Sequence, residues 1–329
     1  MRNPIKSMLE VKNISFSYDK KPVLKNINFF VEKGKHISII GESGCGKSTL
    51  LKIIYGLLHV DEGEVFYNNN KLLGPNYYLV PGEEFMKYQA QDFDLMPFIT
   101  VEENVGKYLS NFYKKEKKKR ILELLELVEM SEYAHVKPQF LSGGQQQRIA
   151  LARVLANEPE VILLDEPFSN IDNFKKNKLR HNLFAYFKEK GITCIVATHD
   201  NADILSYADE VIVLKDGRII AKNPPENLYK NPPNKYTASL FGEVNELPVH
   251  LLMPYEDKEK KVLIYPHEFD LITESLLKVK VQKSYFKGTG FLIEAHFENG
   301  PIFFNYPKKI QENTTVFLSV NNELLKKRL

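Results

Sequence analysis

Two glycine-rich segments of this chain carry residue types that bind phosphate groups, one at 41–49 and one at 141–145. The first follows a short apolar run at 37–40 and leads into a run that can form a helix. Small glycines let backbone N–H groups converge on a phosphate, and the helix adds the positive end of its dipole. Lys47 can reach the outer phosphates of a nucleotide as a catalytic cation, and Ser48 can place its hydroxyl on Mg²⁺. We therefore predict a nucleotide-binding loop formed by Gly41, Ser43, Gly44, Cys45, Gly46, Lys47, Ser48 and Thr49.

The second segment comprises Leu141, Ser142, Gly143, Gly144 and Gln145, and a helical pattern follows it at 146–156. Ser142 can cap this helix, which leaves backbone N–H groups at the glycines free to bind an anion. The segment has no lysine of its own. A nucleotide site needs one phosphate loop, so we interpret the pair as halves of two sites that are completed when two copies meet. A capped helix without a ligand is the alternative.

Two carboxylates follow the uninterrupted apolar run 161–164, where a buried strand is expected to end. Asp165 can hold Mg²⁺ through water, and the alternative role for it is a helix cap. Glu166 can point beyond the γ-phosphate and polarise a water molecule for attack. A kinase with a phosphate loop would need an acceptor pocket, for which we find no motif. Hydrolysis is therefore the predicted reaction.

His199 follows a third apolar run, at 192–197. A lone histidine is more often structural than catalytic. Its place at the end of a central strand, beside the two expected carboxylates, favours a catalytic role. A neutral or protonated imidazole there could contact the γ-phosphate.

The elements needed to position these residues can be predicted from the pattern of apolar residues. Loose alternation at 8–33 indicates an antiparallel β layer, and the later apolar runs indicate strands of a parallel sheet with a crossover helix at 175–190. The segment 92–158 is expected to be helical. It contains the basic run 114–120, which we interpret as the solvated start of a helix, with contact to acidic lipids or a partner as the alternative. Ligands of such sheets bind at the carboxyl ends of the strands.

Composition narrows the class of protein. The 329 residues favour one large and one small domain. A net charge of +3 gives no reason to expect nucleic acid as a partner, and two distant cysteines give no disulfide or metal pattern. No apolar stretch is long enough to span a membrane, and the first residues lack the apolar core of a signal peptide. We expect domains at 1–240 and 241–329, and a chain that stays inside the cell.

The order of these motifs resembles the ATP-binding subunit of an ATP-binding-cassette (ABC) transporter over roughly residues 8–240. The phosphate loop, the signature 141–145, the strand and carboxylates at 161–166, the segment 169–172 and His199 all match. Two further positions follow from the family pattern. Gln91 matches the loop glutamine that senses Mg²⁺ and faces the membrane partner. Tyr18 matches the aromatic residue that stacks on adenine, although Phe16 lies on the same face of the strand.

This resemblance implies an ATPase with a mostly parallel central sheet, an antiparallel β subdomain and a helical subdomain. It implies ATP and Mg²⁺ as ligands, the metal being held by Ser48, Gln91 and Asp165. It also implies a head-to-tail dimer with two ATP molecules between phosphate loop and signature, the partner being a second ABC ATPase subunit, most simply an identical copy. The helical subdomain would dock transmembrane permease subunits, so the chain would lie in the cytoplasm on the inner face of the membrane.

The remainder of the chain alternates in short apolar runs and contains Asn299-Gly300, a strong hairpin signal. With 242–245 and 265–268, it resembles the small C-terminal β domain, of the TOBE or OB-like kind, found in importer ATPases. That implies an extracytoplasmic solute-binding protein as a further partner. Two positions depart from the family pattern: Tyr265 replaces a usual arginine, and 201–203 replaces a usual Gln and Glu-Ala pair.

Three other functions are alternatives to solute import. An exporter ATPase would share the fold, and a non-transport cassette ATPase usually carries two cassettes or a long coiled insertion, which this chain lacks. A purely regulatory module should have lost some of the catalytic residues, yet Lys47, Asp165, Glu166 and His199 are all present. The C-terminal β domain favours import over export.

Overall fold

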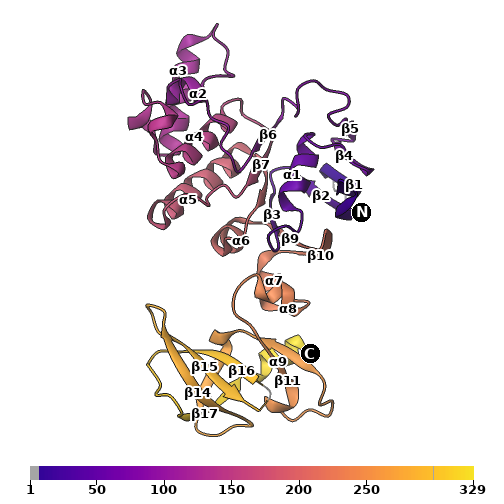
Figure 1. Ribbon diagram of the computed structural model, residues 1–329, viewed down its shortest axis with the longest axis vertical. Helices are drawn as coiled ribbons and strands as arrows, with labels where there is room; N and C mark the ends of the chain where they lie inside the picture. Colours follow the sequence, from indigo (N-terminus) through magenta and orange to yellow (C-terminus); the bar gives the residue numbers. More distant parts are fainter. Residues whose placement is uncertain (1–6, 299) are drawn as a thin grey trace. The chain divides into compact units, whose positions relative to one another are not determined.

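Two β-sheets form the framework of the first part of the chain (Figure 1). The computed structural model describes residues 7–298 and 300–329. Within these residues the chain divides into one compact unit that ends at Pro225 and a second at Glu226–Leu329. Each is described by itself. No helix among the described residues is long and apolar enough to cross a membrane.

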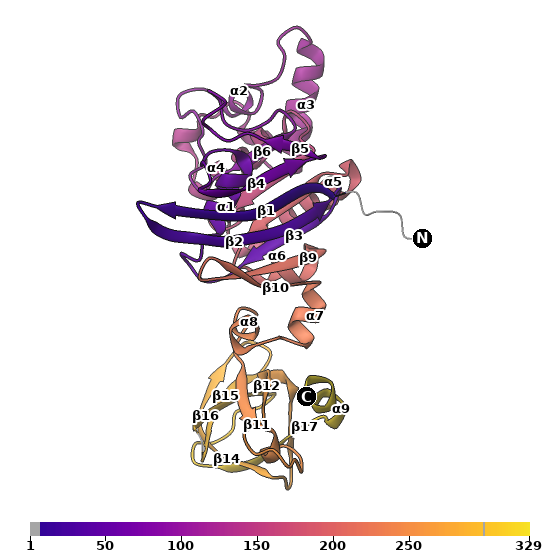
Figure 2. The ribbon, with the colours of Figure 1, turned by 90° about the vertical axis from the view of Figure 1, so that its right-hand side faces the viewer.

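The first sheet of this unit is antiparallel and has the strand order β2-β1-β4-β5. Its strands are β1 (Ser7–Tyr18), β2 (Lys21–Glu32), β4 (Glu62–Tyr67) and β5 (Asn70–Leu72). Figure 2 shows β1 and β2 as long neighbouring arrows. Val11 pairs with Phe29 and Phe16 pairs with Leu24, and these four side chains are buried. The antiparallel layer expected at 8–33 is confirmed, because alternate residues of both strands face the core.

The second sheet is mostly parallel and has the order β10-β9-β3-β8-β7-β6. Its strands are β3 (His36–Ile40), β6 (Met86–Gln89), β7 (Val161–Asp165), β8 (Thr193–Ala197), β9 (Glu210–Lys215) and β10 (Arg218–Asn223). Only β10 runs antiparallel to its neighbour. Every residue of β3, β7 and β8 is buried. A strand covered on both faces has no solvent side, which explains the uninterrupted apolar runs.

Two hydrophobic cores cover the two faces of this sheet. Along β7, Ile162 and Leu164 belong to one core, and Val161 and Leu163 belong to the other. Helix α1 (Lys47–Tyr55) packs against β6, β7 and β8. Two further helices, α5 (Asn173–Lys190) and α6 (Asn201–Tyr207), follow β7 and β8 along the chain. The predicted crossover helix at 175–190 lies within α5.

The helical part lies between β6 and β7 and is seen at the upper left of Figure 1. It comprises α2 (Val101–Val105), α3 (Lys114–Leu127), η1 (Ser131–Tyr133), η2 (Pro138–Phe140) and α4 (Gly143–Leu155). Helices α2 and α3 both pack on α4. The basic run forms the first turns of α3, where Lys114, Lys115 and Lys118 are exposed. Arg120 instead donates to the carbonyl oxygens of Leu155 and Ala156, so the end of the run ties α3 to α4.

The C-terminal unit holds a five-stranded antiparallel sheet of order β13-β17-β14-β15-β16 and a two-stranded sheet β11-β12. Asn245 joins them: its amide donates to the carbonyl oxygens of Ile264 and Phe303 and accepts from the Phe303 N–H. The elements are α7 (Pro225–Lys230), α8 (Lys235–Ser239), β11 (Asn245–Pro248), η3 (Val249–Leu251), β12 (Lys261–Ile264), η4 (Pro266–Glu268), β13 (Phe269–Ile272), β14 (Leu277–Phe286), β15 (Phe291–Phe297), β16 (Gly300–Tyr306), β17 (Thr315–Val320) and α9 (Asn322–Arg328).

The linker region before residue 240 belongs to this unit by its contacts. The ring of Tyr229 in α7 stacks on Tyr265 with centroids 4.7 Å apart, and the Tyr265 hydroxyl donates to the carbonyl oxygen of Ala238. Tyr265, which departs from the family pattern, is therefore a buried packing residue. The ATPase boundary near residue 240 stays a prediction. Of the predicted hairpin turn, Asn299 lies outside the described residues, while β15 and β16 pair from Phe297 and Gly300 onward.

Candidate nucleotide site

The glycine loop 41–46 connects the end of β3 to the start of α1, as the sequence predicts. Gly41 has φ 154° and Gly46 has φ 109°. A Cβ at Gly41 would lie 2.2 Å from the carbonyl oxygen of Leu214, and one at Gly46 would lie 2.7 Å from Leu24 Cδ2. The loop can therefore pass this close to β9 and β2 only with glycine at both positions. Ser43 and Gly44 are exposed, which leaves the outer side of the loop accessible.

The side chain of Lys47 folds over this loop. Its Nζ donates to the carbonyl oxygens of Gly41 at 2.7 Å and Glu42 at 3.0 Å, which places the ammonium group at the loop. Ser48 is half-buried and Thr49 is buried in the first turn of α1. Cys45 is buried as well, and burial raises the pKa of its thiol, so it stays a neutral packing residue of the loop. A cation fixed beside an exposed glycine loop at the start of a helix suits a polyphosphate.

Asp165 ends β7 and is 4% exposed. Among the described residues, its carboxylate accepts one hydrogen bond, at 3.3 Å, from the hydroxyl of Tyr88 on the neighbouring strand β6. Burial and the nearby Asp165 carboxylate raise the pKa of this hydroxyl, so Tyr88 stays protonated and remains a donor. A buried carboxylate with a single neutral donor keeps oxygen lone pairs for a hard cation such as Mg²⁺. Tyr88 is a site residue that the sequence reasoning missed.

Glu166 and His199 meet side by side, because β7 and β8 are parallel neighbours that end at the same edge. Oε1 of Glu166 lies 2.8 Å from Nδ1 of His199. The Glu166 side chain is 17% exposed and that of His199 is 73% exposed. Glu166 adopts φ 50°, which costs a non-glycine residue roughly 1–3 kcal/mol. Its N–H donates to the carbonyl oxygen of Ala197 at 2.9 Å, which helps to hold this conformation.

A charge cluster, buried at Arg180 and Asp203 and half-buried at Asp200, supports the loop that carries His199. Arg180 of α5 contacts both Asp200 and Asp203, and the Thr198 hydroxyl donates to Asp203 at 3.0 Å. Burial raises the pKa of Asp203 to about 6, against the opposing influence of Arg180 and Thr198. Asp200 keeps a lowered pKa although burial acts to raise it, because the Ala202 N–H and Arg180 stabilise its carboxylate. Asp203 belongs to the segment 201–203, which departs from the family pattern.

The second glycine-rich segment forms the N-terminus of α4. Ser142 and Gln145 make a reciprocal cap: Ser142 N–H donates to Gln145 Oε1 at 2.8 Å, and Gln145 N–H donates to Ser142 Oγ at 3.4 Å. Gly143 has open space around it, whereas a Cβ at Gly144 would lie 2.6 Å from the carbonyl oxygen of Asn170. The cap hydrogen bonds of Ser142 and Gln145 stay within the first turn of α4, and Gly144 lies against Asn170 and Ile171 rather than against the phosphate loop.

Gln91 and Tyr18, the two positions predicted from the family resemblance, lie at the margins of the sheet edge where β7 and β8 end. Gln91 is exposed and follows β6, the parallel neighbour of β7. Tyr18 ends β1 and is 43% exposed, whereas Phe16 is 7% exposed. The two rings contact edge to face, with centroids 4.7 Å apart. Burial leaves Phe16 in the core, so Tyr18 is the ring that has a free face for stacking.

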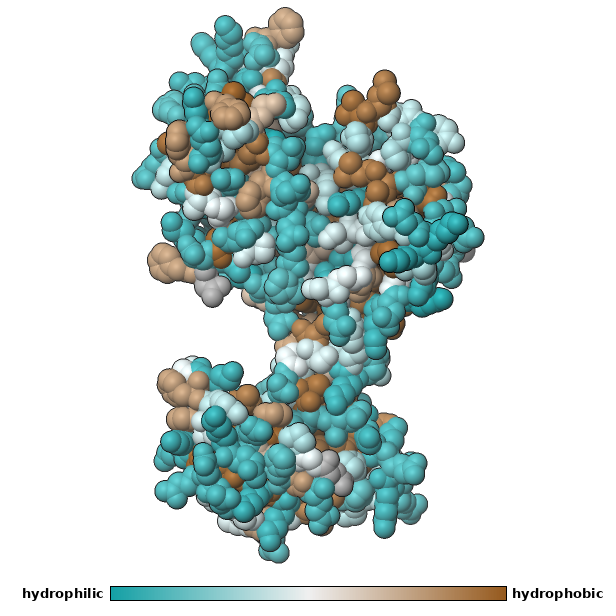
Figure 3. Space-filling model, in the orientation of Figure 1, coloured by the Kyte–Doolittle hydropathy of each residue, from teal (hydrophilic) through white to brown (hydrophobic). Residues whose placement is uncertain are grey.

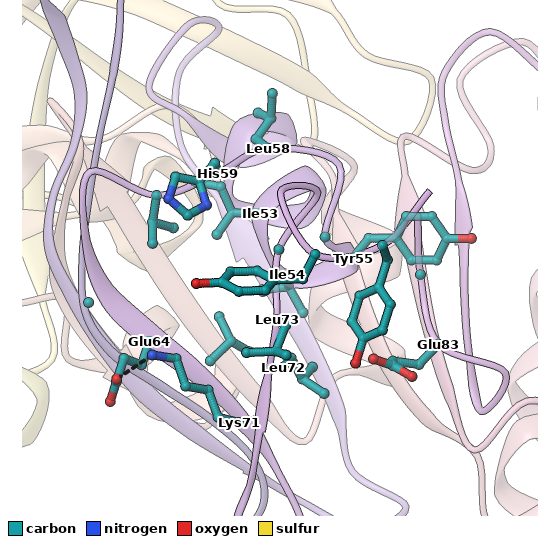
Figure 4. A pocket seen from close by; sticks show the side chains of 18 of the residues that line it. Ile53, Ile54, Tyr55, Leu58, His59, Glu64, Lys71, Leu72, Leu73 and Glu83 are labelled. Carbon is teal, nitrogen blue, oxygen red and sulfur yellow. Dashed lines mark hydrogen bonds and ion pairs between the residues drawn. The ribbon is translucent and has the colours of Figure 1, made fainter. Parts of the chain in front are cut away.

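The hollow in Figure 4 lies apart from these residues. It has a volume of about 270 Å³ and is lined by the C-terminal half of α1, strands β4 and β5 and the segment that follows them. Tyr55, His59 and Glu83 border it, and Lys71 and Glu64 form an ion pair at one side. Neither the glycine loop nor Asp165, Glu166 and His199 line it, so it is separate from the nucleotide site.

The fold and the site together define a nucleotide hydrolase of the phosphate-loop class. Residues 24–169 match the family described as ABC transporter. The chain is 34% identical over 311 residues to the Fe(3+) ions import ATP-binding protein FbpC of Haemophilus influenzae (strain 86-028NP), covering 88% of both chains. It is 35% identical over 283 residues to the spermidine/putrescine import ATP-binding protein PotA of Pasteurella multocida, covering 83% of this chain and 75% of that one.

Solved structures show the same relationship. The dimeric post-hydrolysis structure of the ATP-binding cassette MJ0796 bound to ADP and Pi is 35% identical, with a TM-score of 0.60 over 66% of this chain and 99% of that one. CbiO1 from Clostridium perfringens, part of the ABC transporter complex CbiONQ, matches with 30% identity and a TM-score of 0.60 over 68% of this chain and 91% of that one. The chain belongs to the ABC transporter family, as an ATP-binding subunit of importer type, and the expected fold is confirmed.

Proposed function

We propose that this subunit hydrolyses ATP with Mg²⁺ in a head-to-tail dimer of two copies, and that Glu166 and His199 are the catalytic pair. The observation that carries the proposal is their 2.8 Å contact at the strand edge where Asp165 also ends. A general base must lie within hydrogen-bond reach of the proton that it takes, and an orienting partner fixes its direction. The orienting partner is present, because Glu166 and His199 follow the two adjacent buried strands β7 and β8.

The ligands are proposed from the groups that face this edge. Lys47 and the N–H groups of the glycine loop bind the outer phosphates, while Ser48 and Asp165, with Gln91 from the loop after β6, would hold Mg²⁺. The metal, when bound, neutralises phosphate charge and so favours departure of ADP. Tyr18 supplies an exposed ring for the adenine base. These roles agree with the burial of Asp165 and with the exposure of Tyr18 and Gln91.

Hydrolysis itself needs one proton transfer. Water attacks the γ-phosphorus, the bond to the bridging oxygen of ADP breaks, and the water gives a proton to the Glu166 carboxylate. The products are ADP and phosphate. His199 orients the Glu166 carboxylate through Nδ1 and, being 73% exposed, can present its other ring nitrogen to the γ-phosphate.

Dimerisation follows from the division of the site. The capped start of α4 presents Gly143 with open space around it but has no cation in the segment Ser142–Gln145. It suits a γ-phosphate that Lys47 of another copy already holds. The MJ0796 cassette, which this chain resembles, is described as a dimer. In this arrangement, neither copy by itself has a complete site.

The helical part of the chain provides the surface proposed for membrane subunits. Phe98, Tyr108, Phe112 and Tyr113 are each more than half exposed there. Figure 3 shows apolar patches over this region, at the upper left. We propose that these side chains contact transmembrane permease subunits, which places the chain peripherally on the inner face of the membrane. An extracytoplasmic solute-binding protein would deliver the solute. The relatives are named for iron(III) and polyamines, so these two cargoes are the first to test.

Replacing Glu166 by Gln tests the proposal. The amide keeps the size of the side chain but accepts no proton, so turnover should fall by about 100-fold or more. ATP binding should persist, and an ATP-dependent dimer should accumulate in size-exclusion chromatography. Hydrolysis at the wild-type rate would show that Glu166 is not the base. Turnover per chain that does not depend on protein concentration would show that the dimer is not required.

A further inference from the structure

The peptide group of Glu166 is held by an unusual number of donors. Its carbonyl oxygen accepts from Gln147 Nε2 at 2.9 Å, from Ser169 Oγ at 3.1 Å and from Ser169 N–H at 3.2 Å. Glu166 itself has the left-handed φ of 50° that a side chain with a Cβ rarely adopts. Such a conformation persists only where the surroundings over-determine it. The direction of the Glu166 carboxylate therefore depends on these donors.

Gln147 is the one of these groups that reaches the turn from another element. It lies on α4 and is fully buried, with 0% of its surface exposed. Its amide is used at both ends: Nε2 donates to Glu166, and Oε1 accepts from the N–H of Asn170 at 3.0 Å. The two bonds bracket the turn from Glu166 to Asn170. Because the amide is buried away from solvent, the loss of either bond would leave a buried polar group unpaired.

A second contact fastens the same turn to the first turn of α4. A Cβ on Gly144 would lie 2.6 Å from the carbonyl oxygen of Asn170 and 3.4 Å from Ile171 Cα. The backbones of the signature segment and of this turn therefore touch. Gln147 and Gly144 are three residues apart on α4 and so lie on one face of the helix. The signature end of α4 and the Glu166 turn meet along that face.

We infer that Gln147 is a positioning residue for hydrolysis, which aims the Glu166 carboxylate and locks the Glu166 turn to the signature end of α4. The inference rests on the proposed role of Glu166 as the base. In a head-to-tail dimer, the signature end serves the ATP of the other copy, whereas Glu166 serves the ATP of its own. Gln147 thus joins two groups into one rigid unit: the base of one site and the anion-binding helix end of the other site.

The first test replaces Gln147 by Met, which keeps the length and volume but removes the hydrogen bonds of the amide with Glu166, Ser169 and Asn170. The full-length variant should lose about 100-fold in kcat, as expected for a misdirected base, while KM for ATP changes little. The thermal midpoint should fall by roughly 2–8 °C, because the buried partners of the amide are left unpaired. A kcat within about twofold of wild type would overturn the inference. So would a loss of kcat with a parallel rise in KM, which would indicate a general structural role.

The second test uses Gln147→Glu and the pH. As a carboxylate, the introduced group cannot donate to the Glu166 carbonyl, whereas its protonated form has one donor and one acceptor, like the amide. Burial raises its pKa, so protonation should begin near neutral pH. The kcat relative to wild type at the same pH should rise at least about fivefold from pH 8.5 to pH 6. A flat ratio would overturn the inference, and this test also decides it if Gln147→Met does not fold.

Gln146→Met is the matched control. The Gln146 amide donates to the carbonyl oxygens of Pro138 and Leu141, whereas the bonds to the Glu166 turn come from Gln147. Its kcat ratio to wild type should not change with pH. Glu166→Gln separates the two ideas. If that variant turns over normally, the proposed function fails; if it is inactive while Gln147→Met is fully active, only the role of Gln147 fails.

Discussion

Nδ1 of His199 lies 2.8 Å from Oε1 of Glu166, although the two residues are 33 positions apart in the chain. The contact exists because β7 and β8 pair in parallel, with Asp165 opposite Ala197, so that the residues after them leave the sheet together. The imidazole is mostly exposed and the carboxylate is mostly buried. The pair is therefore fixed at its base and accessible from the solvent side.

Replacing His199 by Ala should lower kcat by roughly 100-fold, because the Glu166 carboxylate loses its orienting partner and the γ-phosphate loses a donor. The thermal midpoint should change by less than about 2 °C, since the histidine side chain is exposed and removing it opens no cavity. Steady-state ATPase assays and thermal unfolding check both parts. Normal turnover would show that the 2.8 Å contact plays no part in hydrolysis.

Replacing Tyr18 by Ala should weaken ATP binding by about tenfold, because a base stacked on an aromatic ring gains roughly 1–3 kcal/mol. Binding of inorganic triphosphate should be unaffected, since that ligand has no base. Tyr18→Phe keeps the ring and should bind ATP like the wild type. Isothermal titration of the three proteins with both ligands distinguishes stacking from a change in the loop. Equal weakening for ATP and triphosphate would refute the adenine contact.

Gly144→Ala should destabilise the protein, whereas Gly143→Ala should not. A Cβ at position 144 would lie 2.6 Å from the backbone oxygen of Asn170, while one at position 143 meets nothing within 4 Å. Overpacking of this kind typically costs about 1–3 kcal/mol, and alanine in a helix is otherwise preferred over glycine. Thermal or urea unfolding of the two variants checks the contrast. Equal stability would mean that α4 and the Asn170 turn separate at no cost.

Asp203 should make stability depend on pH in an unusual direction. Burial raises its pKa from 3.8 to about 6 in the folded protein, so between these pH values the folded chain holds more protons than the unfolded chain. The free energy of unfolding contributed by this group is therefore full below pH 4, falls as the pH rises to 6 and is level above it. The maximum loss is about 3 kcal/mol.

Asp203→Asn removes this titration. Urea unfolding of wild type and variant from pH 4 to pH 7 should show the wild-type free energy of unfolding falling relative to that of the variant as the pH rises. Other titrating groups are common to both proteins and cancel in the difference. A constant difference would mean that Arg180 holds the Asp203 carboxylate ionised throughout the range.

Much of the fold could be predicted from the chain, because the signals are local. Strands β3, β7 and β8 are mostly apolar runs, α1 begins directly after Gly46, and α4 begins at Gly143. The phosphate loop, the two carboxylates and His199 follow these runs, so their place at the strand ends could be predicted as well. The ABC transporter family was recognised from the order of the same motifs.

The supporting residues could not be predicted, because nothing in their local pattern differs from that of ordinary helix or strand residues. Gln147 is the last of three consecutive glutamines, and only packing shows that it alone reaches the Glu166 turn. Tyr88 reads as one more aromatic residue of a strand, and Arg180 as one more basic residue of a polar helix. Their roles depend on contacts with residues 19 or more positions away in the chain.

The chain by itself determined which groups are proposed to bind phosphate and to take up a proton, because glycine, lysine, carboxylate and imidazole are chemically distinct wherever they lie. Only the tertiary structure decided how those groups are aimed. Three features arise where α4 meets the end of β7: the strained Glu166 peptide, the buried Gln147 amide bonded to it, and the backbone contact at Gly144. The direction of a side chain depends on the residues packed around it, and packing brings together residues that are distant in sequence.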